Sequence, residues 1–286
     1  MPSELKMTAA SRPLAGFGAF VTGGSKGIGK AICIGLAEAG AAVALTGRGA
    51  ADGPGTSNAT AAEIVGAGGR ALALNCDVRD AEQVQAAIDR AAETLGRLDL
   101  LVNNAGLFFP GHDVIHMELA QWNETIATHV TGMMLCARFA ADHMIRGGGG
   151  SIVNMSSTAG DPQHDSTGNV VYSVAKAAVE QLTRGLAREL APNNVAVNAI
   201  RPMGLLTEGS LINADWLARY RGTSSGNMPH QGMSDAERMK RFADPSAIVP
   251  AIVHLALCRT GFSGNVVRRT DFNGAGFRDI AVPALA

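Results

Sequence analysis

Short apolar runs alternate with longer segments of helical periodicity along most of this chain. The apolar runs at residues 18–22, 42–46, 71–75, 98–103, 151–156 and 195–200 predict β-strands. Apolar positions recur with helical spacing from residue 27 onward and at 60–67, 81–95, 118–145 and 170–190. Nearly all-apolar strands, each followed by a helix, predict a parallel sheet covered on both faces. The expected fold class is α/β: a doubly wound, Rossmann-like sheet of about seven strands with right-handed crossovers.

The chain offers no clear domain boundary. The glycine run at 147–150 separates a helix from a strand and is too short for a linker between domains. We therefore expect residues 1–286 to form one dinucleotide-binding and catalytic domain with a polar lead-in at 1–13. Residues 160–171 and about 203–245 break the strand-helix alternation, and we expect the second stretch to be a substrate loop or lid. A surface excursion or a subunit contact is the alternative.

Composition narrows the class of partner. A hydrophobic content of 47% over 286 residues supports a sizeable core, and a net charge of -1 offers no basic excess. We expect a small-molecule partner, no nucleic acid and no membrane. The first residues lack an apolar signal core, and no apolar run approaches the roughly 20 residues that span a bilayer, so we expect a cytoplasmic protein.

The four cysteines lie far apart in the sequence and form no metal or redox motif. Cys33, Cys76, Cys136 and Cys258 include no Cys-x-x-Cys pair and have no histidine at metal-ligand spacing. We expect no metal site and interpret the cysteines as small apolar residues in a reducing compartment.

Two local patterns carry candidate chemistry. Tyr172 and Lys176 are four residues apart in a predicted helix and share one face, so the ammonium is expected to lower the tyrosine pKa from its reference of about 10. This makes Tyr172 a candidate general acid or base, although a packed ring beside a solvated charge has the same spacing. Residues 22–29, TGGSKGIG, lie between the first strand and first helix, where backbone amides attract phosphate. The glycine spacing differs from the Gly-x-Gly-x-x-Gly fingerprint, so a purely structural turn is the alternative.

Four motifs together resemble a known family. The glycine-rich turn, the NNAG sequence at 103–106, Ser157 and the Tyr172-x-x-x-Lys176 pair occur in the order found in short-chain dehydrogenases/reductases. The chain resembles the short, soluble branch of that family over about residues 14–274. The resemblance implies an NAD(P)-dependent oxidoreductase that interconverts a secondary alcohol and a ketone. An isomerase, dehydratase or enoyl reductase of the same fold and a catalytically weak NADP-binding sensor or scaffold are the alternatives.

The resemblance also implies which residues bind the dinucleotide. Gly23 permits a sharp turn, Gly27 lets a pyrophosphate approach, and Gly29 lets the first helix pack against the sheet. Asp77-Val78 resembles the position whose carboxylate contacts adenine, and residues 198–202 resemble the strand that ends at the nicotinamide. The full set of expected cofactor-binding residues is Gly23, Ser25, Lys26, Gly27, Ile28, Gly29, Arg48, Asp77, Val78, Asn104, Ala105, Gly106, Tyr172, Lys176 and Pro202.

The end of the second strand favours one dinucleotide. An acid there would hold the ribose hydroxyls of NAD, whereas cations favour the 2'-phosphate of NADP. Gly47 stands at the usual acid position, Arg48 follows it, and Lys26 lies in the glycine-rich turn. We therefore expect NADP(H), with NAD(H) as the alternative.

By the same resemblance, four side chains form the catalytic set. Tyr172 exchanges the proton, Lys176 lowers the tyrosine pKa and binds the nicotinamide ribose, and Ser157 hydrogen-bonds the substrate oxygen, with Ser156 as the alternative. His129 stands where the family has an asparagine that supports a proton-relay water. Histidine has donor and acceptor nitrogens, so we expect His129 to join the relay. The alternative is a histidine that only satisfies local hydrogen bonds.

Substrate and assembly are less constrained by sequence. Met203 replaces a family glycine and adds an apolar side chain near the nicotinamide, which suits a hydroxy or keto compound with an apolar body and a polar handle. The other possible pocket residues, none assigned to the site, are His164, Asp165, Trp216 and His230. The resemblance implies a homotetramer, with a dimer as runner-up.

Overall fold

A single parallel sheet organises the molecule. The computed structural model describes residues 12–49, 53, 55–109, 114–164, 168–207, 242–258 and 261–272. Seven parallel strands lie in the order β3-β2-β1-β4-β5-β6-β7. They are β1 (Gly18–Val21), β2 (Ala42–Gly47), β3 (Arg70–Asn75), β4 (Leu100–Asn103), β5 (Gly150–Met155), β6 (Val195–Arg201) and β7 (Val266–Arg268). This confirms the expected doubly wound α/β fold, whose strand order reverses between β1 and β4.

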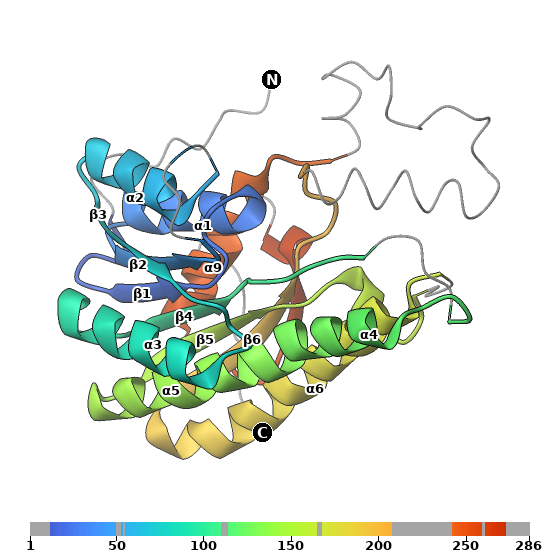
Figure 1. The fold of residues 1–286 in the computed structure, drawn as a ribbon. Helices are drawn as coiled ribbons and strands as arrows, with labels where there is room; N and C mark the ends of the chain where they lie inside the picture. Colours follow the sequence, from blue (N-terminus) through green and yellow to red (C-terminus); the bar gives the residue numbers. More distant parts are fainter. Residues whose placement is uncertain are drawn as a thin grey trace, which may run out of the picture.

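Helices cover both faces of the sheet (Figure 1). One layer contains α1 (Gly27–Glu38), α2 (Ser57–Gly66) and α9 (Val249–Leu257). The other contains α3 (Ala81–Leu95), α4 (Leu119–Ile126), α5 (Gly132–Arg146) and α6 (Val170–Leu190). Helix α9 was not predicted, because seven of its nine residues are buried and its sequence lacks the polar face of an amphipathic helix.

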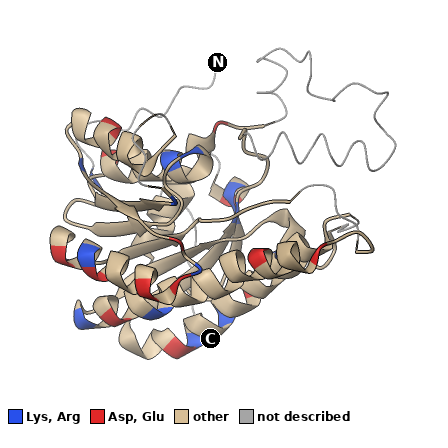
Figure 2. Ribbon diagram, in the orientation of Figure 1, with Lys and Arg blue, Asp and Glu red and all other residues tan. Residues whose placement is uncertain are grey.

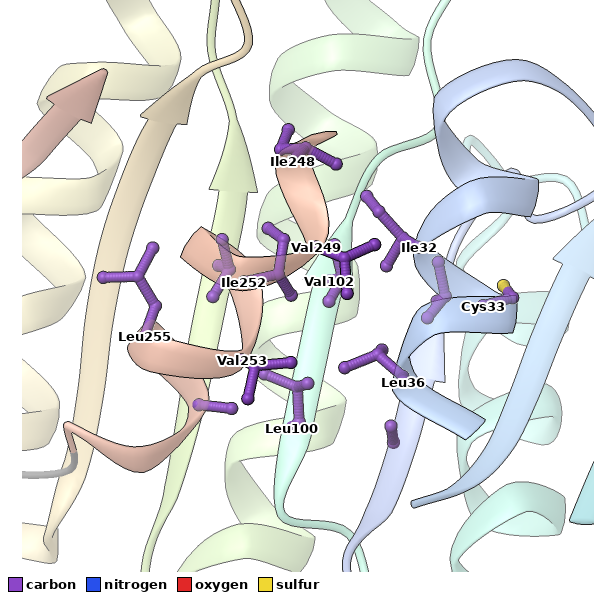
Figure 3. Close-up of a cluster of buried hydrophobic side chains, with 14 of the residues drawn as sticks. Ile32, Cys33, Leu36, Leu100, Val102, Ile248, Val249, Ile252, Val253 and Leu255 are labelled. Atoms are coloured by element: carbon purple, nitrogen blue, oxygen red, sulfur yellow. The ribbon is translucent and has the colours of Figure 1, made fainter. Parts of the chain in front are cut away.

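The core has two halves, one under each helical layer. Figure 3 shows Ile32 and Leu36 of α1 and Ile252 and Val253 of α9 packed against Val102 of β4. The opposite half gathers side chains from β1, β4 and β5 with α3 and α5, including Phe20, Leu101, Ile152, Ile88 and Met144. Because the central strands are buried on both faces, their sequences are mostly apolar and do not alternate, and their few polar residues, such as Asn103 and Asn154, are buried as well.

Capping residues set the helix ends. Helix α2 begins at Ser57, three residues before the predicted start, because the Thr56 hydroxyl accepts a hydrogen bond from the Ala59 N–H at 3.2 Å. Helix α3 begins after Asp80, whose carboxylate accepts from the N–H groups of Glu82 and Gln83, and is capped at its end by Gly96 with φ of 80°. The predicted bounds of α3 and α6 are confirmed.

The long helix predicted at 118–145 contains an irregular turn. Helices α4 and α5 run along one line (Figure 1), but a π-helical segment, η1 (Ala127–Thr131), lies between them. A π turn accommodates one extra residue and is frequent at functional sites. His129 lies in this segment, so the irregular turn carries one of the predicted catalytic side chains.

Charged residues of both signs occupy the outer surface. Figure 2 shows blue and red segments interspersed along α3, α5 and α6. None of the helices in the described ranges has the length and apolar character needed to cross a bilayer. Most of the predicted lid, and Asp165, Trp216 and His230, lie outside the described residues, whereas His164 is exposed.

Candidate active site

The turn between β1 and α1 requires glycine. Gly23 and Gly27 have φ of 67° and 57°, in the left-handed region that glycine adopts without steric cost. The expected sharp turn at Gly23 is thereby confirmed. A Cβ at Gly29 would lie 2.0 Å from the Gly23 carbonyl oxygen and 2.5 Å from Asn104 Nδ2. Gly29 therefore allows α1 to pack against this turn and the β4 loop, rather than against the sheet as expected.

Thr22 and Asn104 join the turn to the loop after β4. The Thr22 hydroxyl accepts hydrogen bonds from the N–H groups of Asn104 and Ala105, both at 2.9 Å. The Asn104 amide donates to the carbonyl oxygens of Thr22 at 2.9 Å and Gly23 at 3.1 Å. These four bonds fix the two backbone segments that form one side of the site.

A cleft of about 630 Å³ opens beside these segments. Twelve predicted cofactor-binding residues line it: Gly23, Ser25, Lys26, Gly27, Ile28, Gly29, Arg48, Asp77, Val78, Asn104, Ala105 and Gly106. Residues that were not assigned to the site also line it: Thr46, Gly47, Cys76, Leu107, Phe108, Thr128 and Thr207. Several of these lie at the carboxyl ends of β2, β3 and β4. Because ligands bind beyond the carboxyl ends of parallel strands, their place in the sequence could have marked them as site residues. Tyr172, Lys176 and Pro202 are not among the lining residues.

Basic side chains gather at one end of the cleft. Arg48 is 60% exposed, and its Nη1 lies 3.8 Å from Glu124 Oε1. Arg79, which was not predicted, donates to Asp77 Oδ1 from Nε at 2.9 Å and to Glu124 Oε1 from Nη1 at 2.8 Å. The hydrogen bond from Arg79 lowers the pKa of Asp77, and the charge of Arg48 adds to the effect. The carboxylate expected to contact adenine is thus already held by an arginine.

Tyr172 is packed beside the cleft among other predicted catalytic side chains. Its ring centroid lies 5.3 Å from that of Phe108, which lines the cleft, and 5.5 Å from that of His129. Burial raises the pKa of Tyr172, and a hydrogen bond with the Ser157 hydroxyl acts in the opposite direction. The expected lowering of the Tyr172 pKa by Lys176 is therefore wrong for this structure.

The surroundings of Lys176 explain the difference. Lys176 Nζ donates to the Met155 carbonyl oxygen at 2.8 Å and lies 5.4 Å from the Tyr172 ring centroid. Burial lowers the pKa of Lys176 to about 7. The desolvation that raises the pKa of Tyr172 also disfavours the lysine charge that was expected to lower it.

His129 contacts the loop after β4 through one ring nitrogen. Its Nε2 lies 2.8 Å from the Leu107 carbonyl oxygen and 3.2 Å from the Leu107 backbone nitrogen. Burial, together with the positive charge of Lys176, lowers the pKa of His129 to about 3. Nδ1 is buried and has no hydrogen-bond partner among the described residues. A Cβ at Gly106 would lie 2.6 Å from the imidazole, so this glycine makes room for the ring.

Two further elements complete the surroundings of the tyrosine. Ser157 follows β5 and caps a short 3-10 turn, η2 (Thr158–Gly160), by accepting from the Ala159 N–H at 3.2 Å. After β6, Met203 has φ of 55°, a left-handed conformation that is strained for this side chain. The buried Arg269 donates to the carbonyl oxygens of Pro202 at 2.9 Å and Met203 at 3.3 Å. A glycine-lined cleft beside a buried tyrosine and lysine is the arrangement expected of a dinucleotide-dependent oxidoreductase.

Comparison with known proteins agrees with this class. The family model for short chain dehydrogenase matches residues 18–215. A cis-4-hydroxycyclohexanecarboxylate dehydrogenase from Sinomonas cyclohexanicum is 35% identical over 255 residues, covering 88% of this chain and 94% of the relative. A 3-oxoacyl-[acyl-carrier-protein] reductase from Synechocystis is 36% identical over 190 residues, covering 66% of this chain and 74% of the relative.

A solved structure has a similar fold. A dehydrogenase/reductase from Sinorhizobium meliloti superposes with a TM-score of 0.74 at 34% identity, covering 90% of this chain and 95% of that one. The chain belongs to the short-chain dehydrogenase/reductase family. This confirms the resemblance carried by the four motifs. Members of the family use NAD(P)(H).

Proposed function

We propose that the protein is an NADP(H)-dependent oxidoreductase that interconverts a secondary alcohol and a ketone. The observation that carries the proposal is the buried Tyr172, hydrogen-bonded with Ser157 and close to Lys176, beside a glycine-lined cleft. Tyr172 exchanges a proton with the substrate oxygen. Retention of all three side chains favours carbonyl chemistry over a sensor or scaffold role.

The cleft fits a nicotinamide dinucleotide. Gly23 and Gly27 leave the backbone and the start of α1 open to a pyrophosphate, because neither carries a side chain that would fill the cradle. Lys26 and Arg48 supply positive charge for a 2'-phosphate, and Gly47 replaces the acid that would repel it. Lys176 and Pro202 hold the nicotinamide half. When bound, the dinucleotide supplies or accepts the hydride.

Side chains of the protein donate and accept the proton of the proposed reaction. Because burial raises its pKa, Tyr172 is a phenol at neutral pH and donates to a developing alkoxide in the reductive direction. Ser157 Oγ donates a hydrogen bond to the same oxygen and holds it near the phenol. Lys176, with a pKa of about 7, exchanges protons readily near neutrality. We also propose that the neutral His129 positions the relay that returns a proton to this centre.

The substrate is proposed from the relatives and the apolar lining. One relative acts on a hydroxycyclohexanecarboxylate and another on a 3-oxoacyl group. Leu107 and Phe108 line the cleft on the side of Tyr172. We therefore favour a ketone with an apolar, alicyclic or acyl body and a carboxylate or thioester handle.

Dinucleotide absorbance tests the function. Cyclic oxo acids and 3-oxoacyl thioesters are offered with NADPH and with NADH, and the corresponding alcohols with the oxidised forms. We expect turnover of at least one group, with NADPH preferred. Tight dinucleotide binding without turnover of any ketone or alcohol would instead favour a sensor.

We propose a homotetramer, with a dimer as runner-up. Met134 on α5 and Val174 on α6 are apolar yet 37% and 41% exposed, which suits a helical subunit contact. Light scattering on the purified protein distinguishes tetramer, dimer and monomer. A monomer at micromolar concentration contradicts the proposal.

A further inference from the structure

A buried ion-pair network lies behind the catalytic side chains. Arg201, at the end of β6, donates to both oxygens of Glu180 on α6, from Nε at 2.8 Å and from Nη2 at 2.9 Å. The side chain of Glu180 is 3% exposed and that of Arg201 is 11% exposed. Ser156 donates from Oγ to Glu180 Oε1 at 2.8 Å, and Arg201 also donates to Asp161. The network thus joins the ends of β5 and β6, the loop after η2, and α6.

Each of three network residues adjoins a residue of the proposed active site. Ser156 immediately precedes Ser157, and Arg201 immediately precedes Pro202. Glu180 lies one helical turn after Lys176, on the same face of α6. The carboxylate of Glu180 is therefore the common partner of the segments that carry the serine and the cofactor-facing proline.

The backbone of η2 is packed so closely against α6 that neither segment can shift towards the other. A Cβ at Gly160 would lie 2.9 Å from Glu180 Oε1 and 3.0 Å from the Lys176 carbonyl carbon and oxygen. A bidentate arginine–carboxylate pair also fixes direction, because the planar guanidinium aligns two parallel bonds. A buried ion pair is weak evidence for stability, since apolar side chains often replace one without loss. A role in fixing the relative positions of β6 and α6 explains this pair better than a role in stability.

We propose that Glu180 is a positioning residue, which through Ser156 and Arg201 fixes Ser157 against the helix that carries Tyr172 and Lys176; this rests on the function proposed above. Without the Glu180 carboxylate, Ser156 loses its hydrogen bond to α6, and the end of β5 is held to that helix only through the bonds of Met155 with Lys176 and of Asn154 with Thr183. Ser157 then moves relative to Tyr172, and the hydrogen bond between them weakens. Displacement of a catalytic group by about 1 Å costs on the order of 100-fold in rate.

The chain offers a matched control. Asp99 is another carboxylate that is 3% exposed and paired with an arginine, Arg97, at 2.6 Å. It also accepts from the Gly18 N–H at 2.9 Å. This pair lies at the amino ends of β1 and β4, whereas the cleft lies at the carboxyl ends of the strands. Asp99→Asn therefore perturbs a buried carboxylate, paired with a half-exposed arginine, without approaching the active site.

The tyrosine content permits a readout that does not depend on turnover. The sequence has two tyrosines, so Tyr220→Phe leaves Tyr172 as the single source of tyrosinate absorbance. In that background we would compare Glu180→Gln, Glu180→Leu, Glu180→Leu/Arg201→Met and Asp99→Asn. The measurements are the Tyr172 pKa, NADPH affinity by fluorescence, kcat and KM, and the temperature of unfolding.

The proposal makes a distinct expectation for each class of variant. In the Glu180 variants the Tyr172 pKa rises, because the Ser157 bond that lowers it is weakened, and kcat falls about 10- to 100-fold. The double variant recovers stability without recovering kcat. Asp99→Asn lowers the unfolding temperature and leaves the Tyr172 pKa and kcat unchanged. NADPH affinity stays within about threefold in Asp99→Asn, because Asp99 lies at the amino ends of the strands, whereas Pro202 follows the carboxyl end of β6.

An unchanged Tyr172 pKa in folded Glu180→Gln overturns the proposal, even if Glu180→Leu fails to fold. Recovery of kcat by the double variant also overturns it, because the effect would then come from an unpaired charge. If the parent protein reduces no ketone, the proposed function fails. The Tyr172 pKa still decides the role of Glu180 in that case.

Discussion

Nε2 of His129 lies within hydrogen-bond distance of both backbone polar groups of Leu107, 2.8 Å from the carbonyl oxygen and 3.2 Å from the nitrogen. A neutral imidazole nitrogen either donates or accepts, so it satisfies one of these groups at a time. An asparagine amide has a donor and an acceptor side by side and can satisfy both. His129 can therefore make only one of the two hydrogen bonds between the π turn and the loop after β4 that an asparagine could make at the same time.

We predict that His129→Asn keeps at least about half of the wild-type kcat/KM, because the amide supplies both functions. His129→Leu removes both and should lower kcat by about 10- to 100-fold. Steady-state kinetics on both variants provide the measurement. Equal activity in the two variants would refute a polar role for position 129.

The second prediction concerns stability and Lys176. Its pKa is about 7 in the folded protein and about 10.5 when the side chain is solvated, so between these values the unfolded chain binds the proton and the folded chain does not. The free energy of unfolding therefore rises with pH across this window, and below it the buried charge costs its full amount. Lys176→Met should be more stable than wild type by a few kcal/mol at about pH 6, and the difference should shrink towards about pH 10.

Urea unfolding at several pH values checks this, with Lys30→Met as the control because the Lys30 side chain is 41% exposed. Lys176→Met should also lose ketone reduction. A stability difference that does not depend on pH would show that the lysine is not desolvated.

The third prediction concerns the choice of dinucleotide. Arg48→Ala should raise KM for NADPH about tenfold and leave KM for NADH within about twofold, because only NADPH carries the 2'-phosphate. Arg90→Ala is the control, since Arg90 is exposed on α3 and pairs with Glu93. An equal rise in KM for NADPH and NADH would show that Arg48 does not bind the 2'-phosphate.

The fourth prediction compares two glycines. Gly29→Ala introduces a Cβ 2.0 Å from the Gly23 carbonyl oxygen, so the turn must move and NADPH affinity should fall by at least about tenfold. A Cβ at Gly185 on α6 would meet no atom of a neighbouring described element within 4 Å, so Gly185→Ala should stabilise the fold by about 0.5–1 kcal/mol. Fluorescence titration and urea unfolding test the pair. Wild-type affinity in Gly29→Ala would show that the turn adapts freely.

Much of the fold was predictable because burial on both faces gives parallel strands a simple apolar sequence. The same reasoning missed α9, whose residues such as Ile252 and Leu255 are apolar without a polar face. It also missed the π turn at 127–131. One extra residue in a helix leaves the local apolar pattern almost unchanged, so the sequence carries little sign of it.

At the site, spacing indicated that the predicted side chains lie close together but not that they are buried. The interval between Tyr172 and Lys176 indicates a shared helix face but not that both groups are buried, and burial determines the direction of both pKa shifts. Arg79 is only two positions from Asp77, but the sequence does not show that its guanidinium binds both Asp77 and Glu124, which is 45 positions away. Such contacts follow from the packing of α4 beside the β3 loop.

The most direct test of the proposed chemistry is ketone reduction by Tyr172→Phe. The phenylalanine keeps the ring and removes the hydroxyl that is proposed to donate the proton. We predict that Tyr172→Phe lowers kcat/KM at least about 100-fold while NADPH affinity stays within about threefold. Activity of Tyr172→Phe within about tenfold of wild type would contradict the proposed proton transfer.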